Sequence, residues 1–321
     1  MKIGAVQPLL FVLKRPAGCS DANLRVNETC GTVSCMNVVA DAMTANLLTY
    51  HGDMNHKPQI LLTNDDGIRS PGLWAAAASL SDLGFVTVTA PRDQASGMGR
   101  SLPNTSDGII HQEQVQVNGQ AWSVFAVGGS PAQAVLHGVF DVLKRKPDLV
   151  VSGINYGENV GSGITISGTV GAALEAAALG IPALAVSLET DVAHHLSYSD
   201  AVDFLVAAKF AARLAQILLE KRLPEDVHVL KVEVPANATA DTPMQWTRVS
   251  QQSYYEPVAP ERTSWNEPGR FTYREAGRLD DEPEDTDVYA LRKKRFVSIS
   301  PLSLDLTSRV DLADLDRLMR E

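Results

Sequence analysis

From Gln59 onward, short β-prone apolar runs alternate with stretches that have the composition of helices. The runs begin at Ile60, Phe85, Asp148 and Ile181, and glycine or proline punctuates the stretches between them. This alternation predicts βαβ units, and hence an α/β fold with a doubly wound, mostly parallel sheet. Ligands of such sheets bind outside the carboxyl ends of the strands, so the residues that come after each strand are where function is expected.

The character of the sequence changes after residue 235, which indicates a domain boundary. We expect a sheet domain over 54–235 and a carboxyl-terminal extension over 236–321, because residues 236–286 are polar and lack a clear period. The pattern predicts strands at 60–63, 85–90, 148–152, 181–187, 288–291 and 296–300, with a weaker β region at 109–127. It predicts helices at 71–83, 131–146, 170–179 and 199–220, and a short final helix.

Charge and cysteine usage exclude some classes of protein. A formal net charge of -10 argues against a general nucleic-acid binder, because phosphate backbones demand a basic surface. All three cysteines (Cys19, Cys30 and Cys35) lie in the first 35 residues, so the rest of the chain fits a reducing compartment. Cys30 and Cys35 are interpreted as unpaired thiols rather than a metal clip, because no second Cys/His pair stands nearby.

The first 53 residues differ in character from the rest of the chain. Their apolar stretch at 9–13 is too short to span a bilayer, and Lys14-Arg15-Pro16 is the wrong flank for a signal-peptide cleavage site. We expect the functional protein to begin near Met54, leaving 321 − 53 = 268 residues, without a membrane anchor. Residues 1–53 would then be an upstream translation or a poorly ordered extension. Detection of the peptide around Leu24 in native protein by mass spectrometry would refute this start.

The first strand runs directly into Asn64-Asp65-Asp66-Gly67. Adjacent unpaired carboxylates repel, which raises at least one pKa unless a cation lies between them. A hard divalent metal is the simplest resolution. Taken alone, the aspartate pair is explained equally well as a turn with one capping residue.

Two further loops come after predicted strands and are expected at the same sheet edge. Residues 90–97 include Ser96, and residues 152–159 include Asn155. Together with the aspartates, these loops offer an all-oxygen set of ligands that suits Mg²⁺ or Mn²⁺ better than zinc.

Ser167-Gly168-Thr169 opens the next predicted helix. Ser167 can cap that helix, and Gly168 would let an anion approach free backbone N–H groups. On composition alone a simple N-cap is the favoured interpretation. A phosphate at this helix start would face a metal on the neighbouring loop, which is the minimum needed for phosphoryl transfer to water.

Other motifs do not fit. Gly97-Met98-Gly99 lacks the third glycine of a dinucleotide fingerprint, and no glycine-lysine pair supports a P-loop. An aspartyl-phosphate mechanism of the D-x-D type would need one residue between its two aspartates, whereas Asp65 and Asp66 are adjacent. His194-His195 lies in a polar connection, where histidines are more often bystanders than acid-base groups.

At these loops the sequence closely resembles the SurE family of metal-dependent nucleoside-monophosphate phosphatases. The resemblance covers about residues 59 to 307. Its matching blocks are ILLTNDDGI at 60–68, APR at 90–92 with SG at 96–97 and SL at 101–102, PDLVVSGIN at 147–155 through SGTVG at 167–171, IPALAVS at 181–187, TDVYA at 286–290 and PLSLDLT at 301–307.

The resemblance implies a Rossmann-like sheet whose carboxyl-terminal extension carries a hairpin exchanged between subunits, giving a homodimer or homotetramer. It implies hydrolysis of nucleoside 5′- and 3′-monophosphates, and for some family members of short polyphosphate. It also implies one divalent cation per subunit, Mg²⁺ or Mn²⁺, bound by Asp65, Asp66, Ser96 and Asn155, and a phosphate surrounded by Asn64, Asn159, Ser167, Gly168 and Thr169.

The chain departs from the family pattern in three places. Where the family has Gly-Thr-Pro followed two residues later by Cys, this chain has Gly129-Ser130-Pro131-Ala132-Gln133-Ala134, near the expected substrate side. Arg100 and Pro103 alter a loop beside the predicted metal. No part of the sequence before Met54 matches the family.

The leading hypothesis is a cytoplasmic phosphomonoesterase that acts on nucleoside monophosphates. Asp65 and Asp66 are the predicted catalytic residues, with Asp65 positioning the attacking water and Asp66 able to exchange roles with it. Two alternatives stay open: a nucleotide-binding stress module without turnover, and a phosphatase of wider range that acts on sugar phosphates or polyphosphate. Phosphate release from a substrate panel with Mn²⁺ separates the three.

Overall fold

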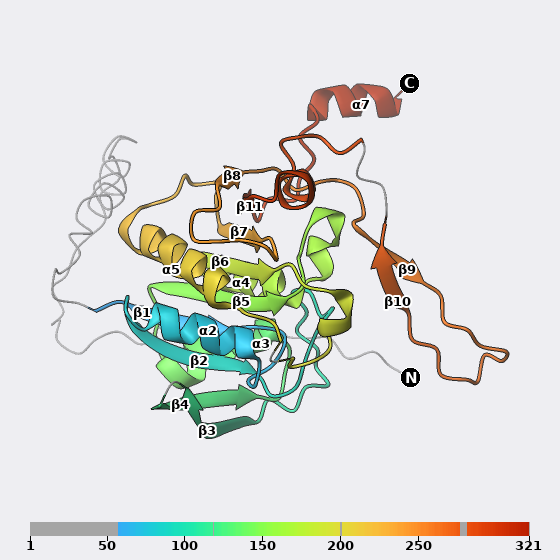
Figure 1. The fold of residues 1–321 in the computed structure, drawn as a ribbon. Helices are drawn as coiled ribbons and strands as arrows, with labels where there is room; N and C mark the ends of the chain where they lie inside the picture. Colours follow the sequence, from blue (N-terminus) through green and yellow to red (C-terminus); the bar gives the residue numbers. More distant parts are fainter. Residues whose placement is uncertain (1–56, 118, 200, 277–280, 321) are drawn as a thin grey trace, which may run out of the picture. The chain divides into compact units, whose positions relative to one another are not determined.

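The computed structural model describes residues 57–117, 119–199, 201–276 and 281–320. The expectations for residues 1–53 lie outside these ranges. The main sheet has nine strands in the order β3-β4-β2-β1-β5-β6-β7-β11-β8 (Figure 1). Within this sheet, only the β3–β4 and β7–β11 pairs are antiparallel. The predicted doubly wound, mostly parallel α/β fold is therefore confirmed.

The strands of this sheet are β1 (Gln59–Thr63), β2 (Phe85–Pro91), β3 (Ile110–Val117), β4 (Gln120–Val127), β5 (Leu149–Tyr156), β6 (Ala183–Leu188), β7 (Val229–Val234), β8 (Met244–Trp246) and β11 (Val297–Leu302). A separate antiparallel ribbon pairs β9 (Tyr255–Val258) with β10 (Thr272–Glu275). The helices are α2 (Pro71–Leu80), α3 (Pro131–His137), α4 (Gly168–Ala178), α5 (Leu205–Glu220), α6 (Asp287–Tyr289) and α7 (Leu312–Arg320).

Both faces of the sheet are covered by helices, which is why its central strands β1, β5 and β6 are mostly apolar. In β1, Ile60 and Leu62 belong to the core on the side of α2 and α5, whereas Leu61 belongs to the core on the side of α3 and α4. Figure 1 shows α2 and α5 lying together over one face. Because side chains of a strand point alternately to its two faces, β1 contributes residues to both cores.

Three sequence-based expectations need correction. The run at 288–291 is not a strand, because Thr286 caps the short helix α6 by accepting a hydrogen bond from the N–H of Tyr289 at 3.3 Å. A short apolar run does not distinguish a strand from a buried helical turn. The helix expected from residue 199 begins only at Leu205, and the helix expected over 131–146 leaves α-helical geometry after His137, continuing as a wider helical turn to Leu143.

The region after residue 235 holds more regular structure than its composition suggests. Strands β8, β9 and β10 all lie between residues 236 and 286, where the sequence pattern predicted no element, although the family resemblance implied a hairpin in the extension. Strands β8 and β11 extend the main sheet beyond β7. In the described part of the chain, no helix combines the length and the apolar character that a membrane crossing requires.

Helix α2 packs so closely on β5 that a side chain at Gly72 would collide with the backbone. A Cβ atom there would lie 2.1 Å from the carbonyl oxygen of Ile154. We predict that Gly72→Ala lowers the free energy of unfolding by about 1–3 kcal/mol, measured by urea denaturation, because the helix must move away from the strand. Gly163→Ala is the matched control, since its Cβ would meet nothing within 4 Å. Equal stability of the two variants would contradict the prediction.

Candidate functional site

The three loops predicted to converge do meet, and they meet around Asp65 and Asp66. The N–H of Ala95, in the loop after β2, donates to the carbonyl oxygen of Asp65 at 2.7 Å. The N–H of Tyr156, at the end of β5, donates to Asp66 Oδ2 at 3.1 Å. The hydroxyl of Thr169, at the start of α4, donates to Asp65 Oδ1 at 2.5 Å. Parallel strands place these segments at one sheet edge, and the hydrogen bonds fix them there.

The turn that carries the aspartates is held by its own flanking residues. Asn64 Nδ2 donates to the carbonyl oxygen of Gly67 at 3.1 Å, and the Gly67 N–H donates back to Asn64 Oδ1 at 3.2 Å. Gly67 has a φ of +96°, a conformation that glycine adopts at low cost. Asn64 therefore shapes the turn, and its contact with a phosphate stays a prediction.

Both carboxylates are buried, with Asp65 4% and Asp66 1% exposed. Burial raises the pKa of Asp65, against the opposing effect of hydrogen bonds from Thr169 and from the N–H of Gly168. Burial also raises the pKa of Asp66 well above its usual value, and the neighbouring charge of Asp65 raises it further. No basic side chain is among the main causes of either shift. The repulsion expected from the sequence is thus present in the structure.

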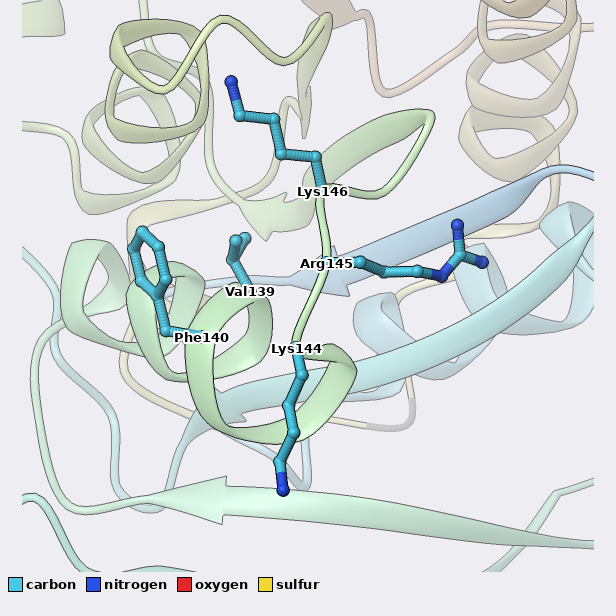
Figure 2. Close-up of a pocket in the computed structure, with 5 residues that line it drawn as sticks. All are labelled: Val139, Phe140, Lys144, Arg145 and Lys146. Carbon is cyan, nitrogen blue, oxygen red and sulfur yellow. The ribbon is translucent and has the colours of Figure 1, made fainter. Parts of the chain in front are cut away.

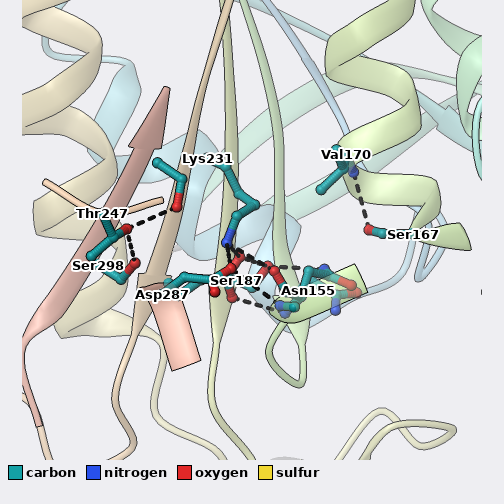
Figure 3. Close-up of polar contacts among 12 residues, drawn as sticks. Asn155, Ser167, Val170, Ser187, Lys231, Thr247, Asp287 and Ser298 are labelled. Atoms are coloured by element: carbon teal, nitrogen blue, oxygen red, sulfur yellow. Dashed lines mark hydrogen bonds and ion pairs between the residues drawn. The ribbon is translucent and has the colours of Figure 1, made fainter. Parts of the chain in front are cut away.

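The start of helix α4 lies directly against Asp65. A Cβ at Gly168 would be 2.7 Å from the Asp65 Cβ, so only glycine permits this approach. Ser167 Oγ accepts the N–H of Val170 at 3.1 Å, which makes Ser167 the N-cap (Figure 3). Its own hydroxyl hydrogen can still be donated to another group. The positive end of the helix dipole therefore faces the predicted metal and phosphate site.

Asn155 presents one amide oxygen at this edge. A bulge in β5 between Ser152 and Asn155 interrupts its register with β6. Asn155 Nδ2 donates to the carbonyl oxygens of Tyr156 at 3.1 Å and Gly157 at 2.7 Å. These two bonds orient the amide, and Oδ1 is its one atom with a lone pair available to a cation. Ser96 is exposed and directly follows Ala95, which is anchored on Asp65.

The donor set fits a hard divalent cation. It combines the carboxylates of Asp65 and Asp66 with the neutral oxygens of Asn155 and Ser96, and such oxygen sets suit Mg²⁺ or Mn²⁺. Within the ranges that the structure describes, no group of three or more His, Cys, Asp or Glu side chains could hold a metal. A zinc-type centre built from such side chains is accordingly absent from those ranges.

Asn159 is fixed beside Asn155 through strand β6. Its Nδ2 donates to Ser187 Oγ at 3.0 Å, and Ser187 is the register partner of Asn155. Its backbone N–H donates to Glu233 Oε2 at 2.8 Å, and its carbonyl accepts from Lys231 Nζ at 2.9 Å. Lys231 and Glu233 were not among the residues predicted from the sequence. Their one signal is two charged residues alternating within the otherwise apolar strand β7.

Two more side chains at the site, those of Gln94 and Tyr198, were not predicted as site residues from the sequence. Gln94 Nε2 donates to Asp66 Oδ1 at 3.2 Å and to the carbonyl oxygen of His195 at 2.8 Å. The hydroxyl of Tyr198 donates to the carbonyl oxygen of Asp66 at 2.8 Å. Tyr198 lies in a connection without a period, so the sequence holds no signal for its contact. His195, interpreted from the sequence as a bystander, takes part here through its backbone carbonyl.

A basic pocket is lined by Val139, Phe140 and Lys144-Arg145-Lys146. The three basic residues are separated from the start of β5 by two residues. They therefore lie at the amino end of the parallel strands, at the opposite edge of the sheet from Asp65. Figure 2 shows their side chains pointing in different directions, so they do not converge on one anion. We assign no role to this pocket.

Comparison with known proteins identifies relatives. Residues 60–256 match the family model "Survival protein SurE". The chain is 41% identical over 269 residues to the 5′-nucleotidase SurE of Methanosarcina mazei, covering 82% of this chain and 98% of the relative. It is 44% identical over 264 residues to that of Thermococcus gammatolerans, covering 81% and 96%. The crystal structure of the SurE protein from Aquifex aeolicus aligns with a TM-score of 0.64 at 31% identity, over 82% of this chain and 100% of that one.

The charges behind Asn159 generate a prediction about stability and pH. Burial, together with the charges of Asp287 and Glu158, outweighs Lys231 and raises the pKa of Glu233 from 4.5 to about 7. Between these pH values the folded protein keeps a proton that the unfolded chain has lost, so the free energy of unfolding falls as pH rises. Relative to Glu233→Gln, the parent should lose roughly 2–3 kcal/mol between pH 4.5 and 7.5, measured by urea denaturation.

The control for this measurement is Glu225→Gln, which neutralises an exposed carboxylate. Its stability should track that of the parent across the whole pH range. A parent and a Glu233→Gln variant whose stabilities run parallel from pH 4.5 to 7.5 would contradict the raised pKa.

Proposed function

The chain belongs to the SurE family, and on that basis we propose that it hydrolyses nucleoside 5′-monophosphates, and also 3′-monophosphates, to nucleoside and phosphate. Its relatives from Methanosarcina and Thermococcus carry the name 5′-nucleotidase. The observation that supports the proposal most is the pair of buried carboxylates, Asp65 and Asp66, against the amino end of α4. A negative pair beside a positive helix end suits a cation and a phosphate bound together.

One divalent cation per subunit, Mg²⁺ or Mn²⁺, is proposed at Asp65, Asp66, Asn155 and Ser96. When bound, such a cation polarises a phosphate oxygen and makes a bound water a better nucleophile. The protein holds the ligands for it in advance. Asp66 is fixed at both oxygens by Tyr156 and Gln94, and Asn155 is turned by its two hydrogen bonds so that Oδ1 is the acceptor.

The phosphate is proposed to lie at the start of α4. The hydroxyl of Ser167 and the helix dipole would stabilise the charge that develops on the phosphate oxygens. Asn64, Asn159, Gly168 and Thr169 complete this side of the site. Asp65 is the proposed water-positioning base, because Thr169 holds one of its oxygens while the carboxylate faces the helix start.

The test is phosphate release from a panel of nucleoside 5′- and 3′-monophosphates, ribose 5-phosphate and polyphosphate, with Mg²⁺ or Mn²⁺. We predict turnover of the nucleotides that EDTA abolishes, and a loss of at least about a hundredfold in kcat for Asp65→Asn and for Asp66→Asn. Glu225→Gln, an equal change of charge at an exposed position, should keep full activity. Full turnover in EDTA would refute the scheme, and nucleotide binding without release would favour a binding module instead.

We also propose a cytoplasmic homodimer or homotetramer. Residues 36–321 contain no cysteine, which fits a reducing compartment. Helix α7 buries none of its residues in the single chain, and Leu312, Leu315 and Leu318 are 65%, 45% and 67% exposed. A helix with such apolar side chains gains stability by packing on another surface.

Substituting Leu315→Glu and Leu318→Glu together tests this assembly. The pair should lower the molar mass measured by light scattering, because charges on the apolar side of α7 oppose burial. A double variant at Glu225 and Glu220, changed to Gln, serves as the control. An unchanged mass for the Leu315/Leu318 variant would exclude α7 from the interface.

A further inference from the structure

A cluster of three charged side chains is buried behind the proposed phosphate site. Lys231 Nζ lies 3.0 Å from Asp287 Oδ2 and 3.4 Å from Glu233 Oε1, and all three side chains are 0% exposed. Figure 3 shows Lys231 reaching toward Asp287. Burying such charges costs free energy that an apolar core of the same volume would not. Fold stability alone therefore gives no reason for them.

Two members of the cluster hold a single residue through both of its backbone polar groups. Glu233 Oε2 accepts the backbone N–H of Asn159 at 2.8 Å, and Lys231 Nζ donates to the Asn159 carbonyl at 2.9 Å. Residues two apart in a strand share one face, so β7 presents the carboxyl group of Glu233 and the ammonium group of Lys231 side by side. The carboxyl oxygen accepts from the N–H and the ammonium group donates to the C=O, so each backbone group meets a partner of opposite polarity.

The side chain of Asn159 is also connected to Glu233, through Ser187. Its Nδ2 donates to Ser187 Oγ at 3.0 Å, and the Ser187 hydroxyl in turn donates to Glu233 Oε1 at 3.4 Å. The Asn159 backbone and amide are thus both connected to Glu233. This arrangement limits where the amide can point relative to the end of β6.

Asp287 connects the same loop to the carboxyl-terminal segment. Its Oδ2 accepts the Gly161 N–H at 3.2 Å, and its Oδ1 accepts the N–H groups of Ser250 and Val288, each at 2.9 Å. The loop that contains Asn159 is therefore anchored at two points, residues 159 and 161, by buried ionisable side chains.

We propose that Lys231 and Glu233 are positioning residues of the phosphate site, which fix Asn159 so that it can bind the phosphate of the substrate. This inference rests on the proposed function, in which Asn159 contacts that phosphate. Lys231 and Glu233 contact Asn159, Ser187 and Asp287, none of which is a proposed metal ligand. Their contribution is to restrict Asn159 before the substrate binds, which lowers the cost of ordering it on binding.

The test compares Glu233→Gln with Thr247→Val. The control removes a buried hydroxyl that bonds Ser298 Oγ at 2.7 Å and Ser300 Oγ at 2.9 Å, on the neighbouring strand and without contact to Asn159 (Figure 3). KM and kcat for a nucleoside 5′-monophosphate, the inhibition constant of inorganic phosphate and stability in urea are measured for both variants. A role confined to stability would change only the last of these.

We expect Glu233→Gln to raise KM and the inhibition constant of phosphate together, by about ten- to a hundredfold, as for loss of a hydrogen bond to a charged group. Thr247→Val should leave both constants unchanged. Values within about twofold of the parent for Glu233→Gln, or an equal rise for Thr247→Val, would overturn the inference.

Two arrangements keep the result decisive. If Glu233→Gln does not fold, Ser187→Ala replaces it and should raise both constants by about three- to tenfold, as for a neutral hydrogen bond. Unchanged constants in Ser187→Ala would then count against the inference. If the parent releases no phosphate from any nucleotide, the proposed function fails, and calorimetric binding of inorganic phosphate to parent and variant tests the positioning role separately.

Discussion

The burial of two adjacent carboxylates at the end of β1 is the constraint on which the rest of the site depends. Asp65 and Asp66 repel one another and lose hydration, so the surrounding elements must offset that cost. The hydroxyl of Thr169, the N–H of Tyr156 and the amide of Gln94 each donate to these carboxylates. These donors come from three different segments, so the same hydrogen bonds that offset the cost also fix the geometry of the site.

A second cluster of buried ionisable side chains lies at the same sheet edge. Behind the aspartates, Lys231, Glu233 and Asp287 are fully enclosed and hold the loop from Asn159 to Gly161. Both clusters place charge where an apolar core would be more stable, and perturbed groups of this kind concentrate at functional sites. The apolar strands and the helices on both faces supply the burial free energy that makes this arrangement tolerable.

The parts that could be predicted from the sequence are those with a local signal. Strand-helix alternation and glycine turns predicted the parallel sheet, and parallel topology alone brought Asp65, Asn155 and Thr169 to one edge. The run at 288–291 was misassigned because a short apolar segment has no distinguishing period. The contacts of Tyr198 with Asp66 and of Lys231 with Asp287 join residues 132 and 56 apart, and neither Tyr198 nor Lys231 lies in a recognised motif. Such pairs are set by tertiary packing, which the local sequence does not specify.

The edge formed by Asp65, Asp66 and Asn155 is proposed to bind a cation and a phosphate together. The most direct measurement is a crystal structure of the protein with Mn²⁺ and a nucleoside monophosphate, using anomalous scattering at the manganese edge. We expect one manganese peak within coordination distance of Asp65 and Asp66, with the phosphate between it and Ser167. Manganese bound elsewhere, or a phosphate held away from the start of α4, would contradict this claim.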